Sequence, residues 1–196
     1  MKKALTIIVA LALVQILAVA QTKVQDRFMG LSMGQQYNDI FNCPELMDVV
    51  GDRYGWTPLK NVPLRSLQVF GVSFGGRYWD NMEYYFSPSG VFYKFRVYSS
   101  YDRAKDAEPR YSSLMGDLDL KYSGKPGITR EEDDQFNPKR GDREKSVTYR
   151  DGRGMVCRLA LEYIQSTNME MNCYLMLYYI NTNLEEEAKT EFVNEL

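Results

Sequence analysis

Histidine is absent from this 196-residue sequence, and its absence removes several kinds of chemistry. The triads of serine and cysteine hydrolases need a histidine as the general base. Zinc sites lose one of their two usual ligand types, and no C-x-x-C spacing supplies the other. Phosphate-binding loops of the G-x-x-x-x-G-K-[ST] or G-x-G-x-x-G kind are also missing. We therefore expect no catalytic residue, no metal site and no cofactor.

Net charge is also small, with 24 basic and 26 acidic side chains. A mildly acidic chain lacks the basic face that nucleic acids require, so we expect no nucleic-acid partner. With 44% hydrophobic and 13% aromatic residues, the chain has enough apolar material for a substantial core. The composition therefore indicates a folded protein that does not bind nucleic acid.

Cysteine is scarce, with Cys43, Cys157 and Cys173 as the three copies. Matching the apolar faces of 155–165 and 170–181 sets Leu159 opposite Leu175 and places Cys157 and Cys173 four residues apart along the ladder. That separation is roughly 13 Å, which is too far for a disulfide. We expect both to be buried thiols, and a bond from either one to Cys43 stays open as the alternative.

One motif imitates an active site. Gly71–Gly75 reads GVSFG and matches the G-x-S-x-G nucleophile elbow. The elbow needs a histidine partner and a turn from strand into helix, whereas period-two sequence follows here, so we do not assign Ser73 as a nucleophile. We expect a turn at Gly75-Gly76 and a strand face formed by Phe70, Val72 and Phe74.

The N-terminus carries an export signal. Lys2 and Lys3 precede an apolar run, Ala4–Leu17, and Ala18-Val19-Ala20 supplies a small-x-small cleavage site. The run is shorter than the roughly 20 residues that span a bilayer. We expect residues 1–20 to be a signal peptide, a periplasmic or secreted mature chain, and no membrane span after cleavage.

The mature chain contains a weak internal repeat. Apolar residues recur with an offset of 68 at Leu46, Val50, Leu114 and Leu118, each set forming one stripe of a helix. Alternating sequence follows each helix. We predict an α+β fold of two tandem helix-plus-antiparallel-sheet units, residues 21–100 and 101–196, which can form one continuous sheet with helices on one face.

Strands are expected in both units. The first unit has 66–74, 77–86 and 91–99, with Met82 opposite Phe95 and Tyr84 opposite Tyr93, and the other face carries Trp79, Glu83, Lys94 and Arg96. The second has 145–150, 155–165 and 170–181.

Between the helix and the strands of the second unit, the charged segment 127–144 shows no periodicity, and we expect an exposed, mobile loop. A short acidic helix is expected from Leu184 to Val193.

Tyrosine-rich strands are the remaining functional signal, because exposed Tyr and Trp are favoured at interfaces. The expected function is an exported, non-catalytic binding or assembly module that recognises a protein or envelope component through an aromatic sheet face. A histidine-free hydrolase with paired carboxylates and a protein inhibitor of a secreted enzyme stay open as alternatives. The candidate binding residues are Trp79, Tyr85, Arg96, Tyr174 and Tyr178.

Two short motifs carry a family resemblance. Phe28–Gly34, FMGLSMG, resembles the F-x-G-I-P-x-G opening of uncharacterised secreted proteins from Gram-negative gut anaerobes. Those proteins also tend to carry K-Y-G-x-P after a helix, and Lys121–Pro126, KYSGKP, is similar with one inserted residue. The tandem layout is also similar to β-lactamase inhibitor protein and to BamE-type assembly lipoproteins, in architecture only. The resemblance implies an exported α+β protein and carries over no site residue.

Overall fold

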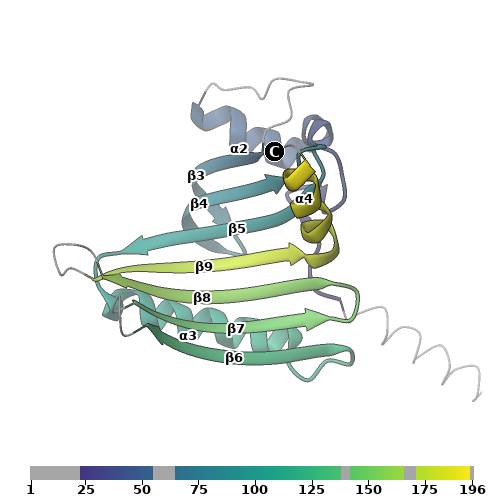
Figure 1. The fold of residues 1–196 in the computed structure, drawn as a ribbon. Helices are drawn as coiled ribbons and strands as arrows, with labels where there is room; N and C mark the ends of the chain where they lie inside the picture. Colours follow the sequence, from purple (N-terminus) through teal and green to yellow (C-terminus); the bar gives the residue numbers. More distant parts are fainter. Residues whose placement is uncertain (1–22, 55–64, 138–141, 166–170, 195–196) are drawn as a thin grey trace, which may run out of the picture.

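One antiparallel sheet of seven strands holds both halves of the chain, in the order β3-β4-β5-β9-β8-β7-β6 (Figure 1). The computed structural model describes residues 23–54, 65–137, 142–165 and 171–194. The strands are β3 (Ser66–Phe74), β4 (Arg77–Phe86), β5 (Phe92–Tyr101), β6 (Ile128–Asn137), β7 (Asp142–Asp151), β8 (Met155–Gln165) and β9 (Met171–Asn181). The predicted α+β class and the single sheet shared by the two units are confirmed, with β5 and β9 meeting at the junction.

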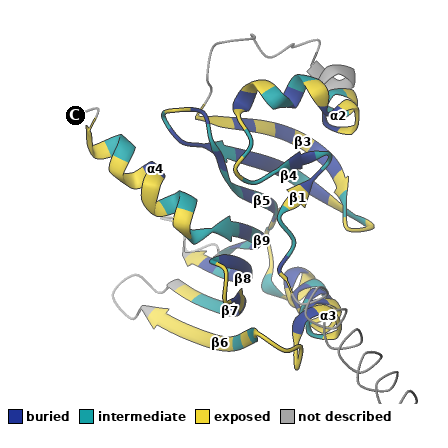
Figure 2. Cartoon of the chain, turned by 90° about the vertical axis from the view of Figure 1, so that its right-hand side faces the viewer, coloured by how far each residue is buried: buried dark blue, intermediate teal, exposed yellow. Residues whose placement is uncertain are grey.

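Two helices cover the same face of this sheet (Figure 2). They are α2 (Pro44–Tyr54), which packs on β3, and α3 (Ala104–Tyr122), which packs on β5, β8 and β9. The apolar stripe predicted for each helix is buried, with Leu46 and Val50 on α2 and Leu114 and Leu118 on α3. We call this side of the sheet the covered face.

The N-terminal segment fills the space between α2 and α3 on the covered face. It forms a small hairpin of β1 (Arg27–Phe28) and β2 (Leu31–Ser32), followed by the 3-10 helix η1 (Tyr37–Asn42). Met29 and Gly30 have φ angles of 46° and 89° and make the tight turn. Phe28 then stacks on Phe95 of β5, with ring centroids 4.3 Å apart. This N-terminal segment is therefore part of the core, and we call it the N-terminal plug.

Both expected hairpin registers are wrong by two residues. Tyr84 lies opposite Phe95, and Leu159 lies opposite Leu177. An apolar pattern of period two fixes the face of each residue, but a shift of two residues leaves every face unchanged. A bulge between Tyr85 and Phe86 helps to set the register of the first hairpin. The cysteine prediction is nevertheless confirmed, since all three thiols are free and buried.

The expected strand face around Gly71 is also wrong. Gly71 has a φ of 62°, and the side chains of β3 change face there: Val72 is buried, whereas Phe70 is 47% exposed. The paired strand β4 changes face with it, so Trp79 is buried on the covered face and does not join Glu83. Ser73 lies in a strand that continues through the Gly75-Gly76 turn into β4, and this context does not provide a nucleophile elbow.

The charged segment 127–144 is not a mobile loop where it is described. It forms β6, an edge strand, and the start of β7. Its charges are matched across the hairpin: Arg143 pairs with Asp134, and Arg150 lies 3.6 Å from Glu131. A charged edge strand also discourages pairing with other chains. Both faces of β6 are polar, which is why no alternation signalled it.

The C-terminal helix α4 (Thr182–Asn194) flanks one end of the sheet on the side away from α2 and α3 (Figure 2). It is held by Glu191, which accepts hydrogen bonds from Ser89 in the β4–β5 turn. The expected acidic helix is confirmed, and Lys189 lies 3.5 Å from Glu185. The expected signal peptide falls outside the described residues. Among those that are described, no helix has the length and apolar character to cross a membrane.

Candidate functional site

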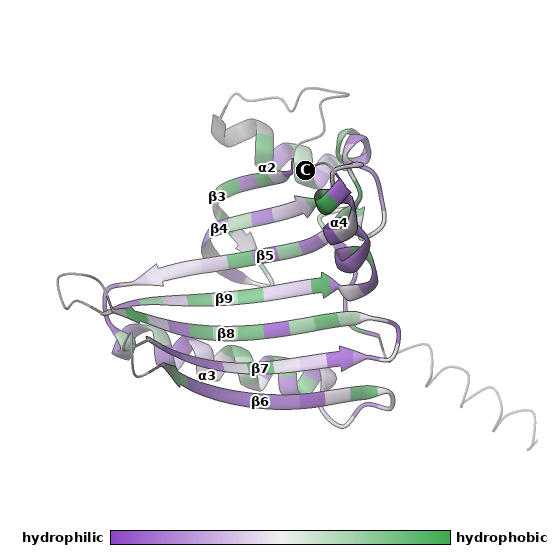
Figure 3. Cartoon of the chain, in the orientation of Figure 1, coloured by the Kyte–Doolittle hydropathy of each residue, from purple (hydrophilic) through white to green (hydrophobic). Residues whose placement is uncertain are grey.

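The open face is the side of the sheet opposite α2 and α3, and the strands that form it carry both hydrophilic and hydrophobic residues (Figure 3). Its centre lies on β4, β5 and β9, where the register places Glu83 beside Arg96 and Arg96 beside Tyr178. One step along the strands, Tyr85 lies beside Lys94. The central strands therefore bring aromatic rings and charges together.

Six of these central residues form what we call the tyrosine–arginine cluster: Glu83, Tyr85, Lys94, Arg96, Tyr98 and Tyr178. The Arg96 guanidinium carbon lies 4.7 Å from the ring centroid of Tyr98, 5.7 Å from that of Tyr85 and 5.9 Å from that of Tyr178. The Lys94 ammonium lies 5.0 Å and 5.3 Å from the Tyr85 and Tyr178 rings. Such cation–π contacts hold the rings and the charged side chains together.

One carboxylate anchors the cluster. Arg96 donates to Glu83 from Nε at 2.8 Å, and the Tyr85 hydroxyl donates to the same oxygen. Burial, and then the Glu83 carboxylate, raise the pKa of Tyr85 well above its usual range. Burial also lowers the pKa of Lys94. The cluster itself contains two cations and one carboxylate, and the Glu185 carboxylate of α4 also acts on Lys94. The cluster contains no group placed as a nucleophile.

Three of the five expected binding residues meet in this cluster, namely Tyr85, Arg96 and Tyr178. Tyr174 lies on the same face, further along β9 opposite Ser100 and Glu162. The placement of Trp79 on this face is wrong. Its indole is buried on the covered face, with Nε1 donating to the Phe74 carbonyl at 3.2 Å.

Tyr98 is the cluster member that our sequence reasoning missed. It lies two residues beyond Arg96 on β5 and therefore on the same face. The alternation that placed Lys94 and Arg96 on this face extends to Tyr98. Its phenol also accepts a hydrogen bond from Gln68 at 3.2 Å, which ties the cluster to β3.

A pair of carboxyl groups occupies the other half of the open face. Glu144 of β7 and Glu162 of β8 lie directly opposite each other. They border a hollow of about 280 Å³ whose rim includes Arg143 and Ile164. Arg158 forms an ion pair with Glu144, whereas burial, and then the Glu144 charge, raise the pKa of Glu162 above its usual range. Two neighbouring acids thus have different environments.

Neither of these sites is a metal centre in the described ranges. Within residues 23–54, 65–137, 142–165 and 171–194, no three cysteine or carboxylate side chains are grouped to hold a metal ion. No protein-family model matches the chain, and no curated protein matches its sequence. The functional argument therefore depends on the geometry of the open face.

Proposed function

We propose that this protein is an exported, non-catalytic binding or assembly module, and that its open face recognises a protein of the cell envelope or a secreted protein. The tyrosine–arginine cluster on the sheet face opposite α2 and α3 is the observation that carries this proposal. Tyrosine and arginine are the residues most enriched, with tryptophan, at the energetic centres of protein interfaces.

The cluster is also held in place before any partner arrives. Arg96 is fixed by Glu83 and by three rings, and Lys94 is fixed by two of the same rings. Side chains that are already ordered lose little conformational entropy on binding. A ready-made surface of this composition fits recognition better than it fits catalysis, because it offers planar rings, donors and charge without a nucleophile.

The location of the protein belongs to the same proposal. The lysines and apolar run at the N-terminus support export to the periplasm or medium. The resemblance to secreted proteins of gut anaerobes supports it too, through Phe28 and Gly30. A partner would then be an envelope component or a secreted enzyme, and inhibition of that enzyme is one form that the binding would take.

Site-specific photo-crosslinking tests the proposal. A photoreactive phenylalanine analogue replaces Tyr98 in the cluster, and the matched control carries it at Leu120, an exposed residue on α3 that lies away from the open face. Exposure to envelope extract should give a discrete adduct from position 98 and none from position 120. Adding Arg96→Ala should weaken the adduct. Equal adducts at both positions, or none at position 98, would contradict the proposal.

A second candidate function rests on the Glu144 and Glu162 pair. Glycosidases use two acids whose environments separate their pKa values, one protonated and one ionised. Glu162 has the raised pKa, and Glu144 is paired with Arg158. If this pair is catalytic, the protein should hydrolyse an oligosaccharide, and Glu162→Gln should abolish turnover while Glu131→Gln, on the neighbouring edge strand, should not. A panel of reducing-end assays without turnover would exclude it.

A further inference from the structure

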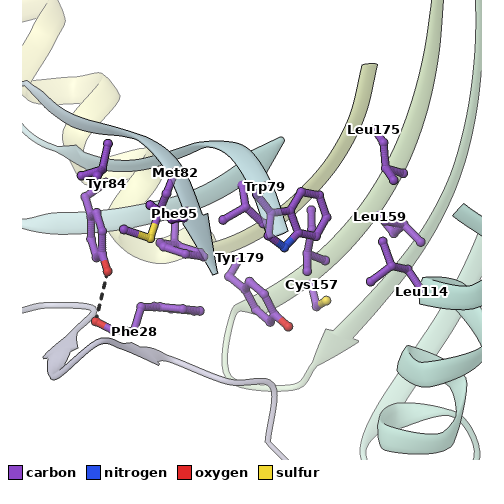
Figure 4. Packing of buried hydrophobic residues seen from close by; sticks show 14 of the residues in the cluster. Phe28, Trp79, Met82, Tyr84, Phe95, Leu114, Cys157, Leu159, Leu175 and Tyr179 are labelled. Carbon is purple, nitrogen blue, oxygen red and sulfur yellow. Dashed lines mark hydrogen bonds between the residues drawn. The ribbon is translucent and has the colours of Figure 1, made fainter. Parts of the chain in front are cut away.

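A second concave site lies on the covered face, away from the tyrosine–arginine cluster. It is a cavity of about 190 Å³ between the β3–β4 hairpin and α3. Its walls are apolar and largely aromatic: Phe74, Trp79, Leu114, Leu118, Leu177 and Tyr179. Figure 4 shows Trp79 and Tyr179 near each other on the sheet and Leu114 on α3, with Cys157 between them in this view. This site shares no residue with the open face.

The size of the cavity limits what can enter it. An engineered apolar cavity of about 150 Å³ in another protein takes up benzene. A cavity of about 190 Å³ therefore admits a single six-membered ring with a short substituent. The rings of Phe74, Trp79 and Tyr179 offer edges and faces to such a ring, and aromatic pairs of this kind add to the free energy of burial.

The mouth of the cavity carries Arg77, Asp117 and Lys121, of which the first two form an ion pair with each other. Asp117 on α3 forms an ion pair with Arg77, whose Nη2 lies 2.5 Å from the carboxylate oxygen and also donates to Ser113. Lys121 lies one helical turn beyond Asp117. Because Asp117 is engaged by Arg77, it does not neutralise Lys121.

The Lys121 ammonium has a neutral partner at the mouth. It donates to the Gln25 side-chain oxygen at 3.0 Å and lies 5.1 Å from the Tyr122 ring centroid. Within the part of the chain that is described, no carboxylate forms an ion pair with it. Desolvation by the surrounding protein lowers its pKa, which is the penalty that an incoming anion would relieve. An unneutralised cation at the rim of an aromatic cavity matches a ligand with a ring and a carboxylate.

We propose that this cavity binds a small, single-ring aromatic carboxylate of the phenylacetate class. The ring lies between Trp79 and Leu114, and the carboxylate forms an ion pair with Lys121. The cavity and the charge at its mouth come from different elements, since Trp79 belongs to β4 and Lys121 to the end of α3. Binding would therefore join the first unit to the helix of the second.

Trp79 supplies a direct readout of binding. The sequence has two tryptophans, so Trp56→Phe leaves Trp79 as the single tryptophan, which is excited selectively at wavelengths that tyrosine does not absorb. Titration of this variant with phenylacetate should change the Trp79 emission saturably. Acetate, which lacks the ring, should leave the emission unchanged. A lack of any saturable change with phenylacetate would overturn the proposal.

Charge variants separate ion pairing from burial. Lys121→Met keeps the length of the side chain and removes its charge, and it should weaken phenylacetate binding by about tenfold or more. Neutral phenylacetamide should bind Lys121→Met and the parent equally. The matched control, Lys125→Met, changes an exposed lysine that does not line the cavity and should bind phenylacetate normally. Equal weakening in both lysine variants would refute the assigned ion pair.

A cavity-filling variant tests the location. Leu118→Phe should block phenylacetate and phenylacetamide alike, provided that its circular dichroism and melting temperature show a folded protein. If that variant does not fold, the indole N–H resonance of Trp79 in the Trp56→Phe protein gives a second measurement. A phenylacetate-dependent shift of that resonance is expected, and its constancy would contradict the site. None of these results bears on crosslinking at Tyr98, so the two proposals fail separately.

Discussion

The covered and open faces use the same strands in opposite ways. On the covered face, rings from distant segments interlock, as Phe28 does with Phe95 and with Tyr179 at 4.9 Å. On the open face, rings are held by cations, as Tyr98 is by Arg96. Burial holds the first set without charge, whereas the second set keeps its charges in contact with solvent. Apolar burial therefore dominates on the covered face, whereas charge and partial exposure dominate on the open face.

Acids differ between the two sides as well. Asp119 on α3 accepts hydrogen bonds from Arg130 at 2.5 Å and from Tyr149 at 2.7 Å. Arg130 and then Tyr149 hold the pKa of Asp119 below its usual value of 3.8. Glu162 on the open face has a pKa above its usual 4.5. Hydrogen bonds and an ion pair stabilise the charged form of Asp119 on the α3 side. On the open face, burial and the nearby Glu144 charge destabilise the charged form of Glu162.

The largest expected contrast comes from one substitution made on each face. Phe28→Ala removes a ring that is 1% exposed and should lower the free energy of unfolding by about 3–5 kcal/mol. Phe70→Ala removes a ring that is 47% exposed and should lower it by less than about 1 kcal/mol. Urea denaturation followed by circular dichroism measures both. Similar losses from the two variants would break the distinction between the faces.

The next largest effect on stability should distinguish the crowded turn at Gly30 from the uncrowded turn at Gly76. A Cβ at Gly30 would lie 3.2 Å from the Cβ of Cys43, and Gly30 has a φ of 89°. Gly76 has a φ of 72°, and a Cβ added there would meet no atom of the described residues within 4 Å. Backbone strain of about 1–2 kcal/mol applies to alanine at either position. Crowding should make Gly30→Ala worse by about a further 1–2 kcal/mol, measured by the same denaturation.

A smaller effect concerns Asp119. Since its pKa is lowered by folding, its carboxylate stabilises the protein above pH 3.8, and that stability is lost as the pH falls through the folded value. Asp119→Asn should therefore lower the free energy of unfolding by about 1–2 kcal/mol at pH 7. The difference from the parent should shrink at pH 3. A difference that stays constant with pH would show that charge is not involved.

The smallest effect should have the opposite sign. Folding raises the pKa of Glu162, so the protein loses stability as the pH rises from 4.5 through the folded value. Glu162→Gln removes that loss and should stabilise the protein relative to the parent at pH 7, but not at pH 4. Thermal melts at the two pH values test this sign. Glu187→Gln, on the exposed surface of α4, provides the control.

Local patterns predicted the elements of this fold well. The bounds of β3, β4 and β8 agree with those expected, because turns such as Gly75-Gly76 interrupt clear alternation. The edge strand β6 was missed, since its charges make sense only beside β7: Asp134 needs Arg143 across the hairpin. Alternation cannot reveal a strand that is polar on both faces.

For the site, alternation along a strand could predict which residues of that strand share a face, but not their neighbours on other strands. Glu83, Lys94 and Arg96 were placed on one face because alternation determines faces. Trp79 was misplaced, because the change of face depends on the backbone conformation of Gly71, between the Phe70–Asn81 and Val72–Trp79 pairs, rather than on hydropathy. The pairing of Glu144 with Glu162 needs the register of β7 and β8, which no local pattern supplies.

The N-terminal plug has a consequence for the order of folding. The Val24 amide donates to the Asp151 carboxylate at 3.1 Å across 127 residues, and the Gln25 amide donates to the Tyr122 hydroxyl at 3.3 Å. The N-terminal plug is the first part of the described chain to be synthesised, and it binds to residues that are synthesised much later. Contacts of such long sequence separation slow folding. We therefore expect the plug to complete its contacts only after the second unit has formed.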